Sequence, residues 1–463
     1  MGGPFGALVR VRQDAWNLSD PDPWHPTLLW YARAVKQLKG VSDVADPRGW
    51  PYLARIHGAI EQPSDWPSGV DDWNSCQHGS WFFLPWHRMY LHYFESIVHD
   101  VIQDLGGPAD WALPFWDYSE DPARSATLAL PPAFVATTWP DGGPNPLREE
   151  ERAAGIRDGD PMDVEDVRLG TWTISFSTDV LARPSFGGPV TGFHHPPAGA
   201  GIVETQPHGT VHVDVGGFNP AGLMSRFHTA PLDPIFWLHH CNIDRLWEVW
   251  RNLDRTELPS VTPWLDFRFA FGTDTARREF PVADVRSTTA PPLLYQYEGV
   301  PVPALPAGPE HAVEPPVDSE PPPELVGASE EPVLVGRDGG RARVAVEPST
   351  RPPRPEATGG RRTFVTVENV TGEGLGAGVY AVLLGDREVG RFSTFGLPEA
   401  SEADTEHGGS GLTFSYDVTD LVSELEALGG GGVAELEVTV RPTRAVVETV
   451  GDISVGRIGV YRE

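Results

Sequence analysis

The chain has 463 residues, more than one ordinary hydrophobic core accommodates, so we expect two domains. A net charge of −30 argues against nucleic acid or an anionic membrane as a partner, because like charges repel. Two cysteines exclude a disulfide scaffold, whereas 16 tryptophans and 40% hydrophobic residues suffice for a packed interior. This composition favours small neutral ligands.

Targeting signals are not evident in the sequence. The first 16 residues contain no continuous apolar stretch and no cleavage site of the kind that secretory signals carry. No segment approaches the roughly 20 apolar residues that a membrane-spanning helix needs. We therefore expect a protein that is cytoplasmic or is exported together with a partner.

Residues 1–300 show helical periodicity and are rich in Trp, His and Leu. In the first predicted helix, Leu28, Ala32 and Val35 recur at helical spacing. Long loops rich in proline and glycine, at 128–170 and 185–201, are of the length that often walls an active site. We expect a mainly α-helical catalytic domain, with its main helices over 26–38, 50–60, 85–105 and 233–253.

The pattern changes after residue 300. Residues 301–360 are dominated by Pro, Glu, Ala and Val, and we expect an extended linker there, with possible short strands within 333–346. From 361 to 463, short alternating segments separated by Gly, Asp and Asn predict a β-sandwich with one helix at 418–428.

Histidines gather in two groups along the helical part. His208 and His212 are four residues apart, a spacing that places both rings on one helix face, and His240 can add a third ring from another helix. The other group is His57, His78 and His87. Neutral imidazole suits Cu, Zn, Fe and Ni, and three histidines per ion suit copper or catalytic zinc. Two such groups predict two metal ions facing each other.

The surroundings of these histidines resemble the tyrosinase and polyphenol oxidase family. The matching motifs include Cys76-x-His78, WFFLPWHRMY at 81–90, His208-x-x-x-His212 and DPIFWLHHCNIDRLW at 233–247. WALPFWDY at 111–118 is similar to a connecting motif of the family. Further segments, DPRGW at 46–50, WLDFRF at 264–269 and VGRIGV at 455–460, resemble plant-type polyphenol oxidases. The resemblance covers most of both domains and leaves out the linker.

The resemblance implies a type-3 pair of copper ions in a four-helix bundle. One copper would take His57, His78 and His87, and the other His208, His212 and His240. In the adjacent pair the family motif makes the second histidine the ligand, so His239 is expected to face the surroundings of the site or the core. The spacing of Cys76 and His78 implies a thioether between the sulfur and the histidine ring.

Three further residues take roles from the resemblance. Glu204 would hold a water beside the copper pair and assist deprotonation of a phenol, and Phe227 would stack against the substrate ring. Gly209 stands where members that hydroxylate monophenols often carry Asn, so we expect oxidation of o-diphenols to o-quinones by dioxygen and doubt monophenol hydroxylation. Asp244 is expected to orient a ligand imidazole or to brace Arg245.

A sandwich on a long linker is typical of latent members, in which a side chain of the sandwich plugs the active site. Phe392 and Phe395 are the candidate plugs, and cleavage of the linker would release activity. Both rings could instead pack inside the sandwich. Two other functions remain open at this stage: a hemocyanin-like dioxygen carrier and an o-aminophenol oxidase. A zinc protein is a third alternative.

Overall fold

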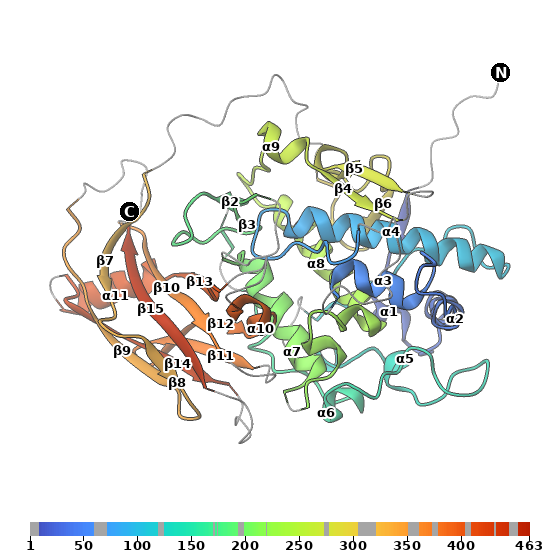
Figure 1. The fold of residues 1–463 in the computed structure, drawn as a ribbon, viewed down its shortest axis with the longest axis horizontal. Coiled ribbons are helices and arrows are strands. Elements are labelled where there is room, and N and C mark those ends of the chain that lie inside the picture. Colours follow the sequence, from blue (N-terminus) through green and yellow to red (C-terminus); the bar gives the residue numbers. More distant parts are fainter. Residues whose placement is uncertain are drawn as a thin grey trace.

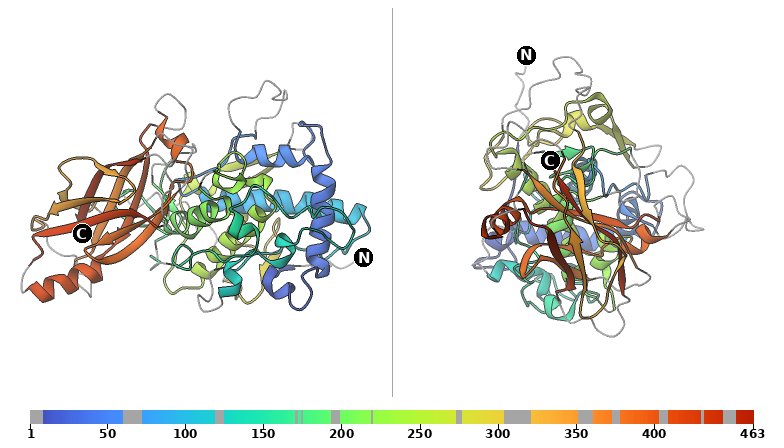
Figure 2. Two further views of the ribbon diagram at one scale, coloured as in Figure 1. Left: turned by 90° about the horizontal axis from the view of Figure 1, so that it is seen from below. Right: turned by 90° about the vertical axis from the view of Figure 1, so that its left-hand side faces the viewer.

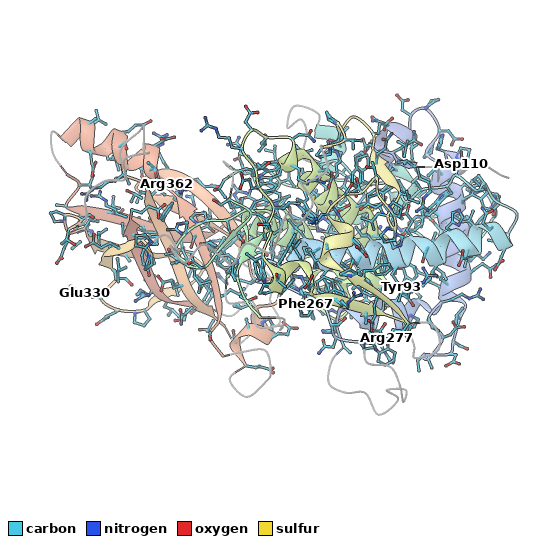
Figure 3. The ribbon with its side chains drawn as sticks, turned by 90° about the horizontal axis from the view of Figure 1, so that it is seen from above. Tyr93, Asp110, Phe267, Arg277, Glu330 and Arg362 are labelled. Atoms are coloured by element: carbon cyan, nitrogen blue, oxygen red, sulfur yellow. The ribbon has the colours of Figure 1, made fainter. Side chains whose placement is uncertain are left out.

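The computed structural model forms two regions side by side, a helical region within residues 9–303 and a β region within 321–463 (Figures 1 and 2). Glu330 and Arg362 lie at one end of the molecule and Asp110 lies towards the other (Figure 3). No helix in the described part of the chain is long and apolar enough to span a bilayer. The described residues are 9–59, 72–118, 125–169, 172–173, 175–192, 199–218, 220–272, 277–303, 321–350, 361–372, 378–402, 409–429, 432–443 and 452–463.

The helical region is built around α4 and α8. Its core is aromatic: Phe94 of α4 stacks on Trp237 of α8, with ring centroids 3.5 Å apart and planes 7° apart. The expected helices are present, with shifted ends. The main helices are α2 (Pro26–Lys39), α3 (Trp50–His57), α4 (Phe83–Asp104), α7 (Thr210–Gly216) and α8 (Ile235–Arg251).

Helix α3 ends at His57, three residues before its predicted end. The next residue, Gly58, adopts an extended backbone. A Cβ at this position would lie 2.5 Å from the ring of Phe227, so only glycine lets the chain leave the helix here. Short elements complete the region: α1 (Ala15–Leu18), α5 (Pro132–Val135), α6 (Ala154–Arg157), α9 (Thr262–Leu265), β1 (Arg10–Arg12), β2 (Ser177–Thr178), β3 (Gly188–Pro189), β4 (Arg268–Phe271), β5 (Arg278–Pro281) and β6 (Tyr295–Tyr297).

The β region is a sandwich, as expected. One sheet has the strand order β13-β10-β15-β7, with β8 also paired to β15, and the other has the order β12-β11-β14-β9. Alternate valines and other apolar side chains fill the space between the sheets. The strands are β7 (Glu324–Ala328), β8 (Val333–Val335), β9 (Gly340–Ala345), β10 (Thr363–Thr371), β11 (Val379–Leu384), β12 (Arg387–Ser393), β13 (Leu412–Asp417), β14 (Glu435–Pro442) and β15 (Ile453–Arg462), with helices α10 (Leu397–Ser401) and α11 (Thr419–Gly429).

The linker prediction for 301–360 is wrong at β7, which lies over 324–328, whereas the short strands expected within 333–346 are present as β8 and β9. Strand β7 pairs with β15 and β9 pairs with β14, so this segment supplies an edge strand to each sheet. Its composition suggested an unfolded stretch, but Val326 and Val344 face inward and are buried against the strands that follow much later in the chain. Residues 304–320 and 351–360 of the predicted linker lie outside the described residues.

The two regions meet through polar contacts that the sequence did not indicate. Arg391 of β12 forms an ion pair with the buried carboxylate of Asp166, with 2.7 Å between Nη1 and Oδ1. Arg183 pairs at 2.7 Å with Glu463, the last residue. Such partly buried pairs hold one docking geometry because separation would leave a charge without its counterion.

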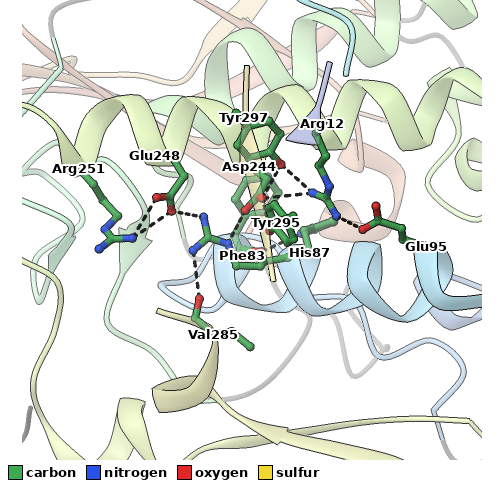
Figure 4. A network of polar contacts seen from close by, with 11 residues as sticks. Arg12, Phe83, His87, Glu95, Asp244, Glu248, Arg251, Val285, Tyr295 and Tyr297 are labelled. Atoms are coloured by element: carbon green, nitrogen blue, oxygen red, sulfur yellow. Dashed lines mark hydrogen bonds and ion pairs between the residues drawn. The ribbon is translucent and has the colours of Figure 1, made fainter. Parts of the chain in front are cut away.

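A buried charge network joins the elements of the helical region (Figure 4). Asp244 of α8 accepts hydrogen bonds from Arg88 of α4 at 2.5 Å and from the hydroxyls of Tyr295 and Tyr297 of β6 at 2.6 Å each. Arg12 of β1 lies 3.5 Å from the same carboxylate. Asp244 thus braces Arg88 rather than a copper ligand or the expected Arg245.

Replacing Asp244 by leucine should destabilise the fold strongly. Removing one partner of a buried ion pair leaves uncompensated charge and typically costs about 3–5 kcal/mol. Urea denaturation of the metal-free chain measures this loss. In contrast, Asp141→Leu breaks the partly exposed pair with Arg33 and should cost less than about 1 kcal/mol. Equal losses in the two variants would contradict this account.

Candidate metal centre

The first histidine group forms one buried cluster. His57 is the last residue of α3, His78 lies in the loop before α4, and His87 lies in α4. Ligand atoms of these three residues and Cys76 lie within 4.8 Å of one another. The Nδ1 atoms of His57 and His87 donate to the backbone carbonyls of Phe227 and Phe83, at 3.0 and 2.8 Å. A carbonyl only accepts, so in both rings the lone pair remains on Nε2, available to a metal.

The second cluster is built in the same way. His208 lies in a π-helical turn (Glu204–Gly209) that leads into α7, and His212 lies in α7. Their Nδ1 atoms donate to the carbonyls of Glu204 and Met224, at 3.3 and 2.9 Å. The Nε2 atoms of His212 and His240 lie 3.4 Å apart. A tetrahedral ion with bonds of about 2.0 Å holds its ligand nitrogens about 3.3 Å apart, so this spacing fits a shared ion.

The clusters face each other across a short distance. The rings of His87 and His240 stack with centroids 4.4 Å apart and planes 7° apart, and those of His78 and His208 lie 5.5 Å apart. Burial lowers the pKa of His87 and of His212 to about 3, so these rings are neutral at physiological pH and suited to a metal. Within the described residues, neither cluster includes a carboxylate.

Cys76 lies between two of the imidazoles. Its sulfur is 3.3 Å from Nδ1 of His78 and 3.4 Å from Nε2 of His87. The side chain is fully buried, and burial raises the pKa of its thiol well above the ordinary value. The sulfur is therefore an uncharged group beside the ring of His78.

The structure brings the three predicted substrate-controlling residues to the edge of the clusters. Glu204 is buried and accepts a hydrogen bond at 2.8 Å from the backbone nitrogen of Gly79, next to His78. The ring of Phe227 lies 4.6 Å from that of His57. A Cβ at Gly209 would lie 2.4 Å from Oγ of Ser393, a residue of the β region.

One of the two candidate plugs reaches the site. The ring of Phe395 stacks on His212 with centroids 4.1 Å apart and planes 16° apart, and lies 6.4 Å from Phe227. Phe392 is wrong as a plug: it is buried inside the sandwich, where it stacks on Phe414 at 4.5 Å. The alternation of β12 explains the difference, because Phe392 faces the other sheet whereas Phe395 follows the end of the strand.

The sequence did not predict the positions of two residues at the second cluster. His239, which was expected to face the surroundings of the site or the core, has a ring nitrogen within the same 4.8 Å group as His208, His212 and His240. Tyr118 contacts Nδ1 of His239 at 2.8 Å. The motif at 111–118, which contains Tyr118, was the one sign in the sequence that this residue has a role. The contact itself could not be predicted, because the two residues are 121 positions apart in the chain.

Comparisons with known proteins agree with this geometry. Residues 47–171 and 161–253 match the family model described as the common central domain of tyrosinase, and residues 322–463 match a domain of unknown function. The chain is 34% identical to the tyrosinase HcTyr1 of Hahella sp. (strain CCB-MM4), over 98% of this chain and all of that protein. It is 30% identical to a chloroplastic polyphenol oxidase of Malus domestica, but over only 60% of this chain and 47% of the plant protein.

Among solved structures, latent apple tyrosinase matches all of this chain and 98% of its own, with a TM-score of 0.68 and 22% identity, which supports the fold of both regions. The identity and full coverage of the bacterial relative, the matched central domain and the two facing histidine clusters lead to one conclusion. The chain belongs to the tyrosinase and polyphenol oxidase family of oxidoreductases, whose active site is a type-3 pair of copper ions.

Proposed function

We propose that this enzyme oxidises o-diphenols to o-quinones with dioxygen and that its β region keeps it latent. One copper is assigned to His57, His78 and His87, and the other to His208, His212 and His240. The observation that carries this assignment is the pair of facing clusters, in which backbone carbonyls occupy Nδ1 of His57, His87, His208 and His212 and leave Nε2 for a metal. The copper pair supplies the activation and reduction of dioxygen; the protein positions the phenol and handles its protons.

The residues around the clusters indicate how a phenol is held. Phe227 offers an aromatic face next to His57, against which a substrate ring can stack. Glu204 is a buried carboxylate next to the site and is our candidate for accepting the hydroxyl proton, through a water. Gly209 has no side chain with which to orient that water, which favours diphenols over monophenols.

Latency is supported by the position of Phe395. Its ring lies flat on His212, in the place and orientation in which the ring of a phenol would stack on a ligand imidazole. The Arg391–Asp166 and Arg183–Glu463 ion pairs hold the β region in this position. We therefore expect the full-length chain to oxidise phenols slowly until Phe395 leaves.

Replacing Phe395 by alanine tests both the reaction and the plug. Burying a phenylalanine side chain contributes about 1.5–3 kcal/mol, so its loss should raise the accessible fraction of the site by roughly tenfold or more. Oxygen consumption with catechols should rise accordingly, while tyrosine-like monophenols should remain poor substrates of both proteins.

Phe280→Ala is a suitable control, because Phe280 packs on the helical region away from the clusters, against His92. It should leave the rate unchanged. Reversible oxygen binding without turnover of catechols in Phe395→Ala would instead indicate an oxygen carrier. A preference for o-aminophenols over catechols would contradict the proposed substrate class.

We also propose that Cys76 and His78 become joined by a thioether. The bond would form between the sulfur and a carbon of the imidazole, the S–H bond and a ring C–H bond would break, and dioxygen would take up the two hydrogens with their electrons to give hydrogen peroxide. The copper-loaded, oxygen-exposed chain should therefore weigh less than its sequence by the mass of two hydrogen atoms, by intact-protein mass spectrometry.

Cys241→Ser should retain this mass difference, because Cys241 lies in α8 within the core and contacts neither cluster through any described hydrogen bond. Cys76→Ser should abolish it. An unmodified mass in the active wild-type enzyme would rule the thioether out.

Glu204 should make the stability of the metal-free protein depend on pH. Burial raises the pKa of Glu204 to about 8, from an ordinary value of 4.5. Between these values the folded chain retains a proton that the unfolded chain releases, so its contribution to the free energy of unfolding falls as pH rises through that window. Glu204→Gln removes the titration.

The difference in free energy of unfolding between wild type and Glu204→Gln should therefore shift steadily against the wild type from pH 4.5 to about pH 8. The contributions of the buried histidines to the free energy of unfolding cancel in this difference, because these histidines are present in both proteins. A constant difference for Glu204→Gln would contradict a raised pKa.

A further inference from the structure

The second cluster contains one imidazole more than a catalytic copper needs. His239 and His240 follow each other on α8, both are buried, and their ring centroids lie 5.0 Å apart. Ligand atoms of both lie within 4.8 Å of those of His208 and His212. A catalytic ion keeps a coordination position open for its reactants, and a fourth imidazole would fill that position. The protein must therefore distinguish His239 from His240.

The hydrogen bond on Nδ1 distinguishes His239 from its neighbours in the cluster. His208 and His212 each direct Nδ1 at a backbone carbonyl, which only accepts. His239 directs Nδ1 at the hydroxyl of Tyr118, 2.8 Å away, and a hydroxyl can donate as well as accept. The direction of this one hydrogen bond decides which nitrogen of His239 carries the proton.

Neighbouring groups fix that direction. The guanidinium of Arg245 can only donate, and its Nη1 donates to Oδ1 of Asn242 at 3.3 Å. Since the amide oxygen of Asn242 faces Arg245, its nitrogen is the atom that hydrogen-bonds the Tyr118 side chain. Asp117 holds Arg245 in place with an ion pair of 2.8 Å. The oxygen of Tyr118 thus receives one hydrogen bond, and its own proton is left for His239.

We propose that Tyr118 is a positioning residue that holds His239 in the form protonated on Nε2, so that His240 and not His239 completes the ligands of the second copper. In this form Nδ1 of His239 accepts from Tyr118 and Nε2 bears a hydrogen, so neither nitrogen offers a lone pair to a metal. His240 has no such partner: within the described residues its Nδ1 makes no hydrogen bond, and its Nε2 lies 3.4 Å from that of His212.

This assignment gives a role to two segments that the proposed reaction leaves unused. Asp117 and Tyr118 end the motif 111–118, while Asn242 and Arg245 follow the histidine pair on α8. The four residues form one chain of hydrogen bonds that ends on His239. The proposal relies on the copper ligands named under the proposed function, but the protonation of His239 does not depend on a bound metal.

Nuclear magnetic resonance of the full chain labelled with ¹⁵N-histidine measures the protonated nitrogen directly, in the metal-free and the copper(I)-loaded states. The signals of His239 are identified by their loss in His239→Gln. We expect His239 to carry its proton on Nε2 in both states, and His208 and His212 to carry theirs on Nδ1. A proton on Nδ1 of His239 in the wild type would overturn the proposal.

Tyr118→Phe removes the donor and should move the proton of His239 towards Nδ1. Tyr31→Phe is the matched control: Tyr31 is equally buried, and its hydroxyl donates at 2.9 Å to the carbonyl of Pro234, just before α8. It should leave the signals of His239 unchanged. An unchanged His239 in Tyr118→Phe, with a folded protein, would also overturn the proposal.

Metal content provides a second readout, by mass spectrometry of the chain with copper alone as the probe. His240→Gln should lose the second copper, because His239 cannot replace the missing ligand. His240→Gln combined with Tyr118→Phe should recover part of that copper, since His239 is then free to bind. If the double variant does not recover the second copper and its His239 is still protonated on Nε2, Tyr118 does not have the proposed role.

These outcomes separate the two proposals. If His240→Gln retains both coppers while the resonances behave as expected, the ligand assignment fails and the effect of Tyr118 on His239 stands. If the second copper is lost but the wild-type His239 carries its proton on Nδ1, the copper assignment stands and the role of Tyr118 fails.

Discussion

The carboxylate of Asp244 holds together the two helices on which the metal centre depends. Arg88 follows His87 directly on α4, and Asp244 lies about one turn after His240 on α8, so the hydrogen bond between Arg88 and Asp244 sets the two helices in register. The result is the close stacking of His87 on His240. Burying these charges costs solvation energy that an apolar pair would not incur. Their contribution here is directional, since an ion pair from Arg12 and hydrogen bonds from Arg88 and the β6 tyrosines meet at one carboxylate (Figure 4).

The direction of hydrogen bonds is also important at the two histidine clusters. Four of the imidazoles donate Nδ1–H to backbone carbonyls, which fixes both the ring orientation and the nitrogen available to a metal. His239 differs from these four, because the partner of its Nδ1 is the hydroxyl of Tyr118. Backbone carbonyls belong to the fold and are insensitive to substitution, whereas the chain from Asp117 to His239 depends on side chains. The helical scaffold therefore determines where the imidazoles lie, and side-chain hydrogen bonds determine which of them can bind.

The sequence predicted those structural features that depend on interactions between neighbouring residues. The periodicity of α2, the i,i+4 spacing of His208 and His212, and the alternation of β14 all survive folding, because neighbouring residues set them. The failures depend on distant partners. Strand β7, which was not predicted, forms by pairing with β15, more than 130 residues later in the chain. Phe392 and Phe395 are alike in the sequence, and only the end of β12 assigns one to the sandwich core and the other to His212.

At Gly209, the packing of the β region over the clusters and the chemistry of the substrate constrain the same position. In the sequence, the missing side chain of Gly209 had a consequence only for the choice of phenol, because an asparagine there would orient a water. In the folded chain a Cβ at 209 would lie 2.4 Å from Oγ of Ser393, one residue beyond the core residue Phe392 and two before Phe395. A larger residue would have to displace the side chain of Ser393, close to the end of the strand that leads to Phe395. The contact with the β region therefore favours a small residue at 209, whatever phenol the site accepts. The proposed preference for diphenols would then depend on how the site is closed as much as on how the substrate is bound.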